Sequence, residues 1–105
     1  MTGTIEFALL VRLREVVAGS PATEVDLRRL LEEADAWERT LRAQLEASEG
    51  RLAMLAADDS SSLAAAADEL RRIEELRRAL TDLTAQLAGL ERRARVLRTQ
   101  WLLEQ

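Results

Sequence analysis

The 105-residue sequence lacks histidine, cysteine, tyrosine, lysine and asparagine, and these absences remove most kinds of catalytic site. Without cysteine there is no disulfide and no thiolate metal ligand, and without histidine there is no imidazole base or ligand. Serine, threonine and the carboxylates are the main reactive side chains that remain. We therefore expect a non-enzymatic protein with no cofactor, no metal ion and no small-molecule substrate.

Glycine, proline and aromatic residues are also scarce. The chain contains one proline, four glycines, two tryptophans and one phenylalanine, so long stretches run without a helix-breaking residue. Leucine, alanine, glutamate and arginine dominate instead. This composition is typical of long helices and coiled coils rather than of sheets or deep globular cores. It predicts an all-α protein.

The charges disfavour nucleic acid as a partner. Nineteen acidic residues stand against fifteen basic ones, for a net charge of −4, whereas nucleic-acid binding needs a basic surface. Every base is arginine, which suggests a GC-rich bacterial genome, with a designed sequence as the open alternative. The first residues do not show the basic region, apolar run and cleavage site of a secretory leader, and no apolar run approaches about eighteen residues, so we do not expect a membrane partner. The expected protein is soluble and cytoplasmic.

A heptad repeat organises the C-terminal part of the chain. Apolar residues recur in two series, the first at Ala66, Ile73, Leu80, Leu87, Ala94 and Trp101, and the second at Leu76, Leu83, Leu90 and Leu97. These are the a and d positions of a coiled coil, which leave a narrow apolar seam along one side of a helix. Such a seam must pack against another helix, so a partner helix is expected within the chain or outside it.

Helix boundaries follow from capping and turn residues. We predict helices over residues 4–18, 21–57 and 63–103 within one domain, residues 1–105. Gly19 suits the left-handed end of the first helix, while Ser20 and Pro21 suit the start of the second. Thr23 with Asp26 offers another start one turn later. The two long helices match in length and are joined by about five residues, which predicts a long antiparallel helical hairpin.

The first helix has more apolar surface than one groove of a hairpin can cover. Residues on two of its sides and at the C-terminus therefore form the predicted interface with another molecule. This interface comprises Ile5, Phe7, Leu9, Leu10, Val11, Leu13 and Val17 together with Trp101, Leu102 and Leu103. We expect a homodimer, with a tetramer as the alternative, that completes a helical bundle. Whether the first helix packs on its own hairpin or is exchanged between chains stays open.

Charged clusters supply the remaining candidate sites. Four arginines near the C-terminus could receive an anionic partner, although they also suit the dipole of a helix end and nearby acids: Arg92, Arg93, Arg95 and Arg98. The acidic groups at Glu32, Glu33 and Asp35, and at Glu74 and Glu75, fall outside the apolar seam. We interpret these acids as solvated helix faces rather than as a hard-cation site.

The function expected from these features is protein–protein interaction through helix packing. The protein would be a self-associating coiled-coil scaffold, adaptor or regulator that binds another helical protein. A small helical chaperone for a secretion or assembly client is the alternative. A third reading is an accessory protein that binds anionic lipid or nucleic acid through the C-terminal arginines.

Overall fold

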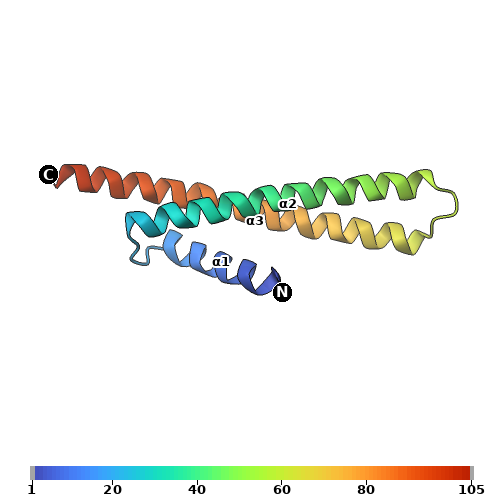
Figure 1. The fold of residues 1–105 in the computed structure, drawn as a ribbon, viewed down its shortest axis with the longest axis horizontal. Coiled ribbons are helices and arrows are strands. Elements are labelled where there is room, and N and C mark those ends of the chain that lie inside the picture. Colours follow the sequence, from blue (N-terminus) through green and yellow to red (C-terminus); the bar gives the residue numbers. More distant parts are fainter. Residues whose placement is uncertain (1, 105) are drawn as a thin grey trace. The chain divides into compact units, whose positions relative to one another are not determined.

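The computed structural model describes residues 2–104, with side chains from Phe7 onward. Three helices account for 88% of these residues: α1 (Thr2–Val17), α2 (Glu24–Ala57) and α3 (Leu63–Leu103). No strand occurs among them, and α2 and α3 pack closely as a hairpin (Figure 1). The predicted all-α fold, with a short apolar helix preceding a helical hairpin, is confirmed.

The chain divides into two compact units, which are described separately. The turn unit is Glu38–Asp82 and contains the second part of α2, the connecting turn and the first part of α3. The terminal unit combines Met1–Trp37 with Leu83–Gln105, so it contains α1, the start of α2 and the end of α3.

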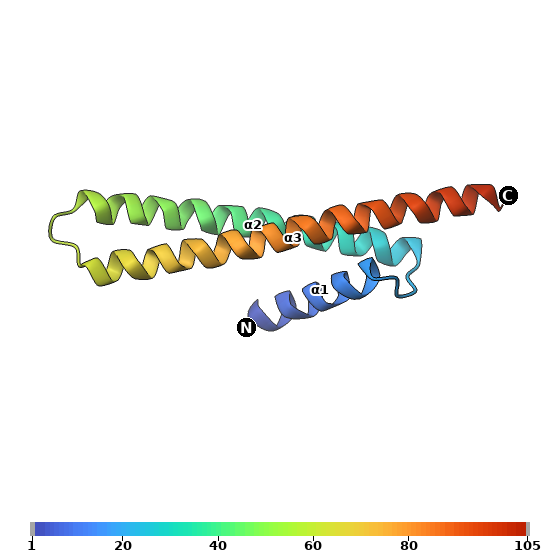
Figure 2. The same ribbon diagram turned by 180° about the vertical axis from the view of Figure 1, so that it is seen from behind.

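In the turn unit the two helices run antiparallel on either side of the connection at residues 58–62 (Figures 1 and 2). Leu41, Ile73 and Leu76 are buried, as expected of seam positions. Cross-helix ion pairs join Arg51 to Glu69 at 3.1 Å and Arg77 to Glu49 at 3.5 Å. The Glu69 side chain is only 15% exposed, whereas the other three side chains are about half exposed or more. Ion pairs that remain in contact with water contribute little free energy, so these two favour the register more than they stabilise the hairpin.

One polar residue lies inside the seam of this unit. The Ser48 side chain is fully buried, and its Oγ accepts a hydrogen bond of 2.9 Å from Arg51 Nη2. The same guanidinium donates from Nε to Glu69 on α3. A buried hydroxyl costs free energy unless it is hydrogen-bonded, so Arg51 both satisfies Ser48 and links the two helices.

The turn itself is closed by local hydrogen bonds. Asp58 Oδ1 accepts from the Ser60 hydroxyl at 2.7 Å and from the Ser60 amide at 3.0 Å. These bonds, the side-chain one first, hold the pKa of the Asp58 carboxyl below its ordinary value. Ser62 Oγ then accepts from the Ala65 amide at 3.1 Å, which caps the first turn of α3. All of these contacts lie within the turn and the start of α3.

Because the turn is locally closed, lengthening it should be tolerated. We expect a short glycine-rich insertion between Asp59 and Ser61 to leave the helical content unchanged and to lower the melting temperature only slightly, since loop-closure entropy grows slowly with length. The same insertion at Leu83, if it is not a whole heptad long, should unfold the protein because it moves every later seam residue to another face. Circular dichroism during thermal unfolding measures both effects, and equal tolerance at the two places would contradict a continuous seam in α3.

In the terminal unit α1 lies beside the start of α2 and the end of α3 (Figures 1 and 2). The core of this unit takes residues from all three helices: Leu13 and Val16 of α1, Leu27, Leu30 and Ala34 of α2, and Leu83, Leu87, Leu90 and Ala94 of α3. Leu13, Val16, Leu83 and Leu90 are completely buried. In this structure, therefore, α1 packs on helices of its own chain.

The connection between α1 and α2 confirms one sequence signal and corrects another. Gly19 has a φ of 115°, in the left-handed region, and the Ser20 and Gly19 amides donate to the carbonyls of Glu15 and Val16 in the paired pattern of a Schellman cap. The start of α2, however, is not at Pro21 but at Glu24.

The later start of α2 follows from a reciprocal cap. The Asp26 amide donates to Thr23 Oγ1 at 3.1 Å, and the Thr23 amide donates to Asp26 Oδ2 at 3.3 Å. This arrangement satisfies two amides of the helix start, which Ser20 and Pro21 do not achieve here. Hydrogen bonds from Thr23, first from its amide, hold the pKa of the Asp26 carboxyl below its ordinary value. Predicted α1 bounds also shift, from 4–18 to Thr2–Val17.

Two residues of α3 determine how closely α1 approaches it. A Cβ atom added at Gly89 would lie 2.9 Å from Val17 Cγ1, so only glycine leaves room for this contact. One turn later, the Arg93 guanidinium donates to the Val16 carbonyl and, at 3.4 Å, to the Gly19 carbonyl. Arg93 thus adds a second donor to the Val16 carbonyl, which also accepts from the Gly19 amide, and reaches the Gly19 carbonyl just beyond α1.

Candidate interaction surface

Near the C-terminus the apolar seam of α3 is no longer covered by a neighbouring helix. Its positions are buried at Leu87, Leu90 and Ala94, but Leu97 is only partly buried and Trp101 is 61% exposed. Figures 1 and 2 show the reason: the last turns of α3 extend beyond the first residue of α2. Leu102 and Leu103 are also exposed. The apolar pattern therefore continues after the neighbouring helix has ended.

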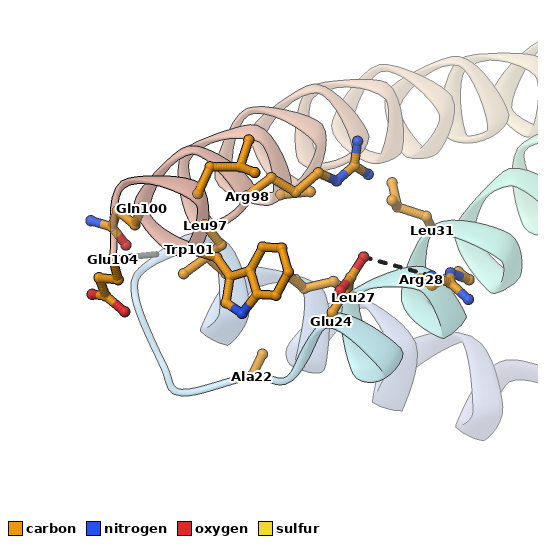
Figure 3. A pocket seen from close by; sticks show the side chains of 12 residues that line it. Ala22, Glu24, Leu27, Arg28, Leu31, Leu97, Arg98, Gln100, Trp101 and Glu104 are labelled. Atoms are coloured by element: carbon orange, nitrogen blue, oxygen red, sulfur yellow. Dashed lines mark ion pairs between the residues drawn. The ribbon is translucent and has the colours of Figure 1, made fainter.

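A pocket of about 600 Å³ lies where the seam opens. The loop before α2 and the first turns of α2 form one side, and the last turns of α3 form the other: Ala22, Glu24, Leu27, Arg28 and Leu31, then Ala94, Leu97, Arg98, Gln100, Trp101, Leu102 and Glu104. In Figure 3 the Trp101 indole stands between the two sides, with Leu27 and Glu24 beside it. We call these twelve residues the terminal pocket.

Charges around the terminal pocket are of both signs. Glu24 and Arg28 form an ion pair of 3.6 Å along α2, with both side chains exposed (Figure 3). Arg98 on α3 and Glu104, which directly follows α3, line the pocket on either side of Trp101. Two acids and two bases therefore surround an apolar floor. Such a site can receive an apolar side chain or helix flanked by polar groups, but it presents no net charge to a strongly anionic ligand.

The structure divides the predicted interface residues into three groups. Trp101 and Leu102 line the terminal pocket, and Leu103 is exposed beside it. Leu13 is in the core of the terminal unit, and Val17 contacts the Gly89 position. On α1, Leu9, Leu10 and Val11 are partly exposed and Phe7 is 68% exposed. The side chain of Ile5 lies outside the described residues.

The four C-terminal arginines lie in different surroundings. Arg93 turns toward the end of α1, and Arg98 lines the terminal pocket. Arg92 and Arg95 are exposed on α3.

The sequence did not predict the α2 side of the pocket. Its pattern assigns Leu27 to the apolar seam of a helix and Leu31 to a position beside that seam, and neither assignment indicates a pocket. The signal that could have found it is the Thr23–Asp26 cap, which places Ala22 in a loop.

Other kinds of site are not seen in the part of the chain that the structure describes. The acidic clusters at Glu32, Glu33 and Glu74, Glu75 are exposed, and no group of three potential metal ligands gathers among residues 2–104. Within the same residues, none of the helices combines the length and apolar character needed to cross a membrane. No protein-family model, curated protein or solved structure matches this sequence.

Proposed function

We propose that the protein is a non-enzymatic helical interaction module, which scaffolds, adapts or regulates by packing an apolar helix of another protein molecule into the terminal pocket. The observation that supports this proposal is the exposed end of the α3 seam. Trp101 is 61% exposed and Leu102 is 64% exposed at a pocket with an apolar floor. Aromatic residues at the centre of a pocket are frequent anchors of protein interfaces.

Self-association is part of the proposal, with a homodimer expected and a tetramer as the alternative. Contiguous exposed apolar surface is uncommon on stable monomers, and this chain exposes Phe7 on α1 as well as the end of α3. The expectation of a bacterial, cytoplasmic protein rests on composition and belongs to the same proposal. A chaperone that shields an apolar segment of a client would use the same pocket, but it would be polydisperse or poorly stable until the client is added.

The proposal predicts that the terminal pocket binds an amphipathic helix. Replacing Trp37 by phenylalanine leaves Trp101 as the only tryptophan, whose fluorescence then reports on the pocket. Titration with a synthetic heptad-repeat peptide that has leucine at a and d, and no tryptophan, should shift the Trp101 emission to shorter wavelength in a saturable manner, because the indole leaves water.

A matched pair of variants assigns the binding to the pocket. Leu97→Glu places a carboxylate in the pocket lining and should abolish the shift, since an unpaired carboxylate is costly to desolvate. Val96→Glu adds the same group at the adjacent, exposed position outside the lining and should leave the shift intact. No shift in the parent, or equal loss in both variants, would contradict the proposal.

A further inference from the structure

The charges of the terminal pocket are self-complementary. A two-fold dimer brings the same surface of both copies together, so that surface must contain groups that pair with each other. Glu24, Arg28, Arg98 and Glu104 supply equal numbers of both signs. A nucleic acid or an anionic membrane would instead require an excess of basic residues at the site. The charge balance therefore favours a second copy of this chain as the occupant.

The order of charges along the last turns of α3 and the residue that follows it also selects an orientation. Arg98 lies three residues before Trp101 and Glu104 three residues after it, and all three line the pocket. If two such helix ends pair antiparallel around Trp101, Arg98 of each copy lies level with Glu104 of the other. Parallel pairing would instead align Arg98 with Arg98 and Glu104 with Glu104. Antiparallel pairing thus gives two attractive alignments where parallel pairing gives two repulsive ones.

We propose that the terminal pocket is occupied by the end of α3 from a second copy, with the two helix ends antiparallel and Trp101 near the two-fold axis. This inference rests on the proposed function, and it adds the identity of the partner and its orientation. Each copy then covers the Trp101 and Leu102 side chains of the other, which are 61% and 64% exposed in the single chain. Arg98 and Glu104 determine which pairs of chains can associate.

Charge reversal tests the pairing directly. By light scattering coupled to size exclusion, the wild type should change from monomer to dimer across the micromolar range. Arg98→Glu alone, or Glu104→Arg alone, should weaken the dimer by about tenfold, because two exposed attractive pairs become two like-charge contacts. An equimolar mixture of the two single variants should recover wild-type association as a heterodimer, and the double variant should recover it as a homodimer. Arg95→Glu, exposed nearby but outside the pocket lining, is the matched control and should have no effect.

The outcomes separate this inference from the proposed function. A wild type that stays monomeric throughout, while the Trp101 emission still responds to the heptad-repeat peptide, would overturn the second-copy inference and the expected self-association, and would leave only the binding of a helix from another protein in the terminal pocket. Failure of both measurements would remove both. A dimer that forms with no loss in either single variant would show that another surface holds the copies together. Loss in both variants with no recovery on mixing would show that Arg98 does not lie level with Glu104 of the other copy. Either result would overturn the antiparallel arrangement.

Discussion

Replacing Leu90 with alanine is expected to lower the free energy of unfolding by about 2 to 5 kcal/mol. Leu90 is completely buried at a seam position of α3, in the unit that also contains α1 and the start of α2. Truncation removes apolar contacts and leaves a cavity between helices that can close only in part. The measurement is urea unfolding followed by circular dichroism, with the shift in midpoint converted through the slope of the transition.

Leu70 provides the control on the same helix. It is 48% exposed, so Leu70→Ala removes less buried surface and should cost under about 1 kcal/mol. Both substitutions have the same effect on helix propensity, and their difference therefore reports burial alone. Equal destabilisation by the two variants would contradict the assignment of the seam to Leu90 and its heptad neighbours.

Replacing Gly89 with leucine is expected to displace α1 from the terminal unit. The added Cβ alone would approach Val17 Cγ1 to 2.9 Å, closer than real Cβ contacts, and the rest of the side chain has still less room. Because Val17 is β-branched, it has few alternative rotamers with which to move aside. Hydrogen exchange should show rapid exchange of α1 amides, and limited proteolysis should cut the connection between α1 and α2.

Gly50 is the matched control for this substitution. It lies inside α2, and an added Cβ there would meet nothing within 4 Å. Gly50→Leu should stabilise the protein by up to about 1 kcal/mol, because glycine is a poor residue for a helix interior. If Gly89→Leu leaves α1 as well protected as Gly50→Leu does, the close approach of α1 to α3 is wrong.

Sequence periodicity was sufficient to predict the hairpin and most of its core. The three- and four-residue spacing that includes Leu87, Leu90 and Ala94 predicts these buried positions without reference to any other helix, because such a pattern requires a covered seam. Gly19 was equally readable, since few residues other than glycine adopt its backbone conformation. Features of this kind depend only on neighbouring residues, so a short stretch of sequence is enough to predict them.

Roles that depend on a distant segment could not be predicted in the same way. Gly89 appears in the sequence only as an isolated glycine inside a helix. The structure shows that its missing side chain leaves room for Val17 of α1. Arg93 belongs to a run of arginines, yet it alone donates to the carbonyls at the end of α1. The terminal pocket likewise depends on α2 starting at Glu24. The sequence offers two possible starts, one at Ser20 and Pro21 and one at Thr23 and Asp26, and does not decide between them.

The exposed end of α3 is the central interface proposed for this protein. The measurement that tests it most directly is the emission of Trp101 as the only tryptophan, recorded while the protein concentration rises through the micromolar range and then after addition of the heptad-repeat peptide. We predict a shift to shorter wavelength under at least one of these conditions, because a partner removes the 61% exposed indole from water. An emission that stays typical of a water-exposed indole under both conditions would contradict the proposed interface.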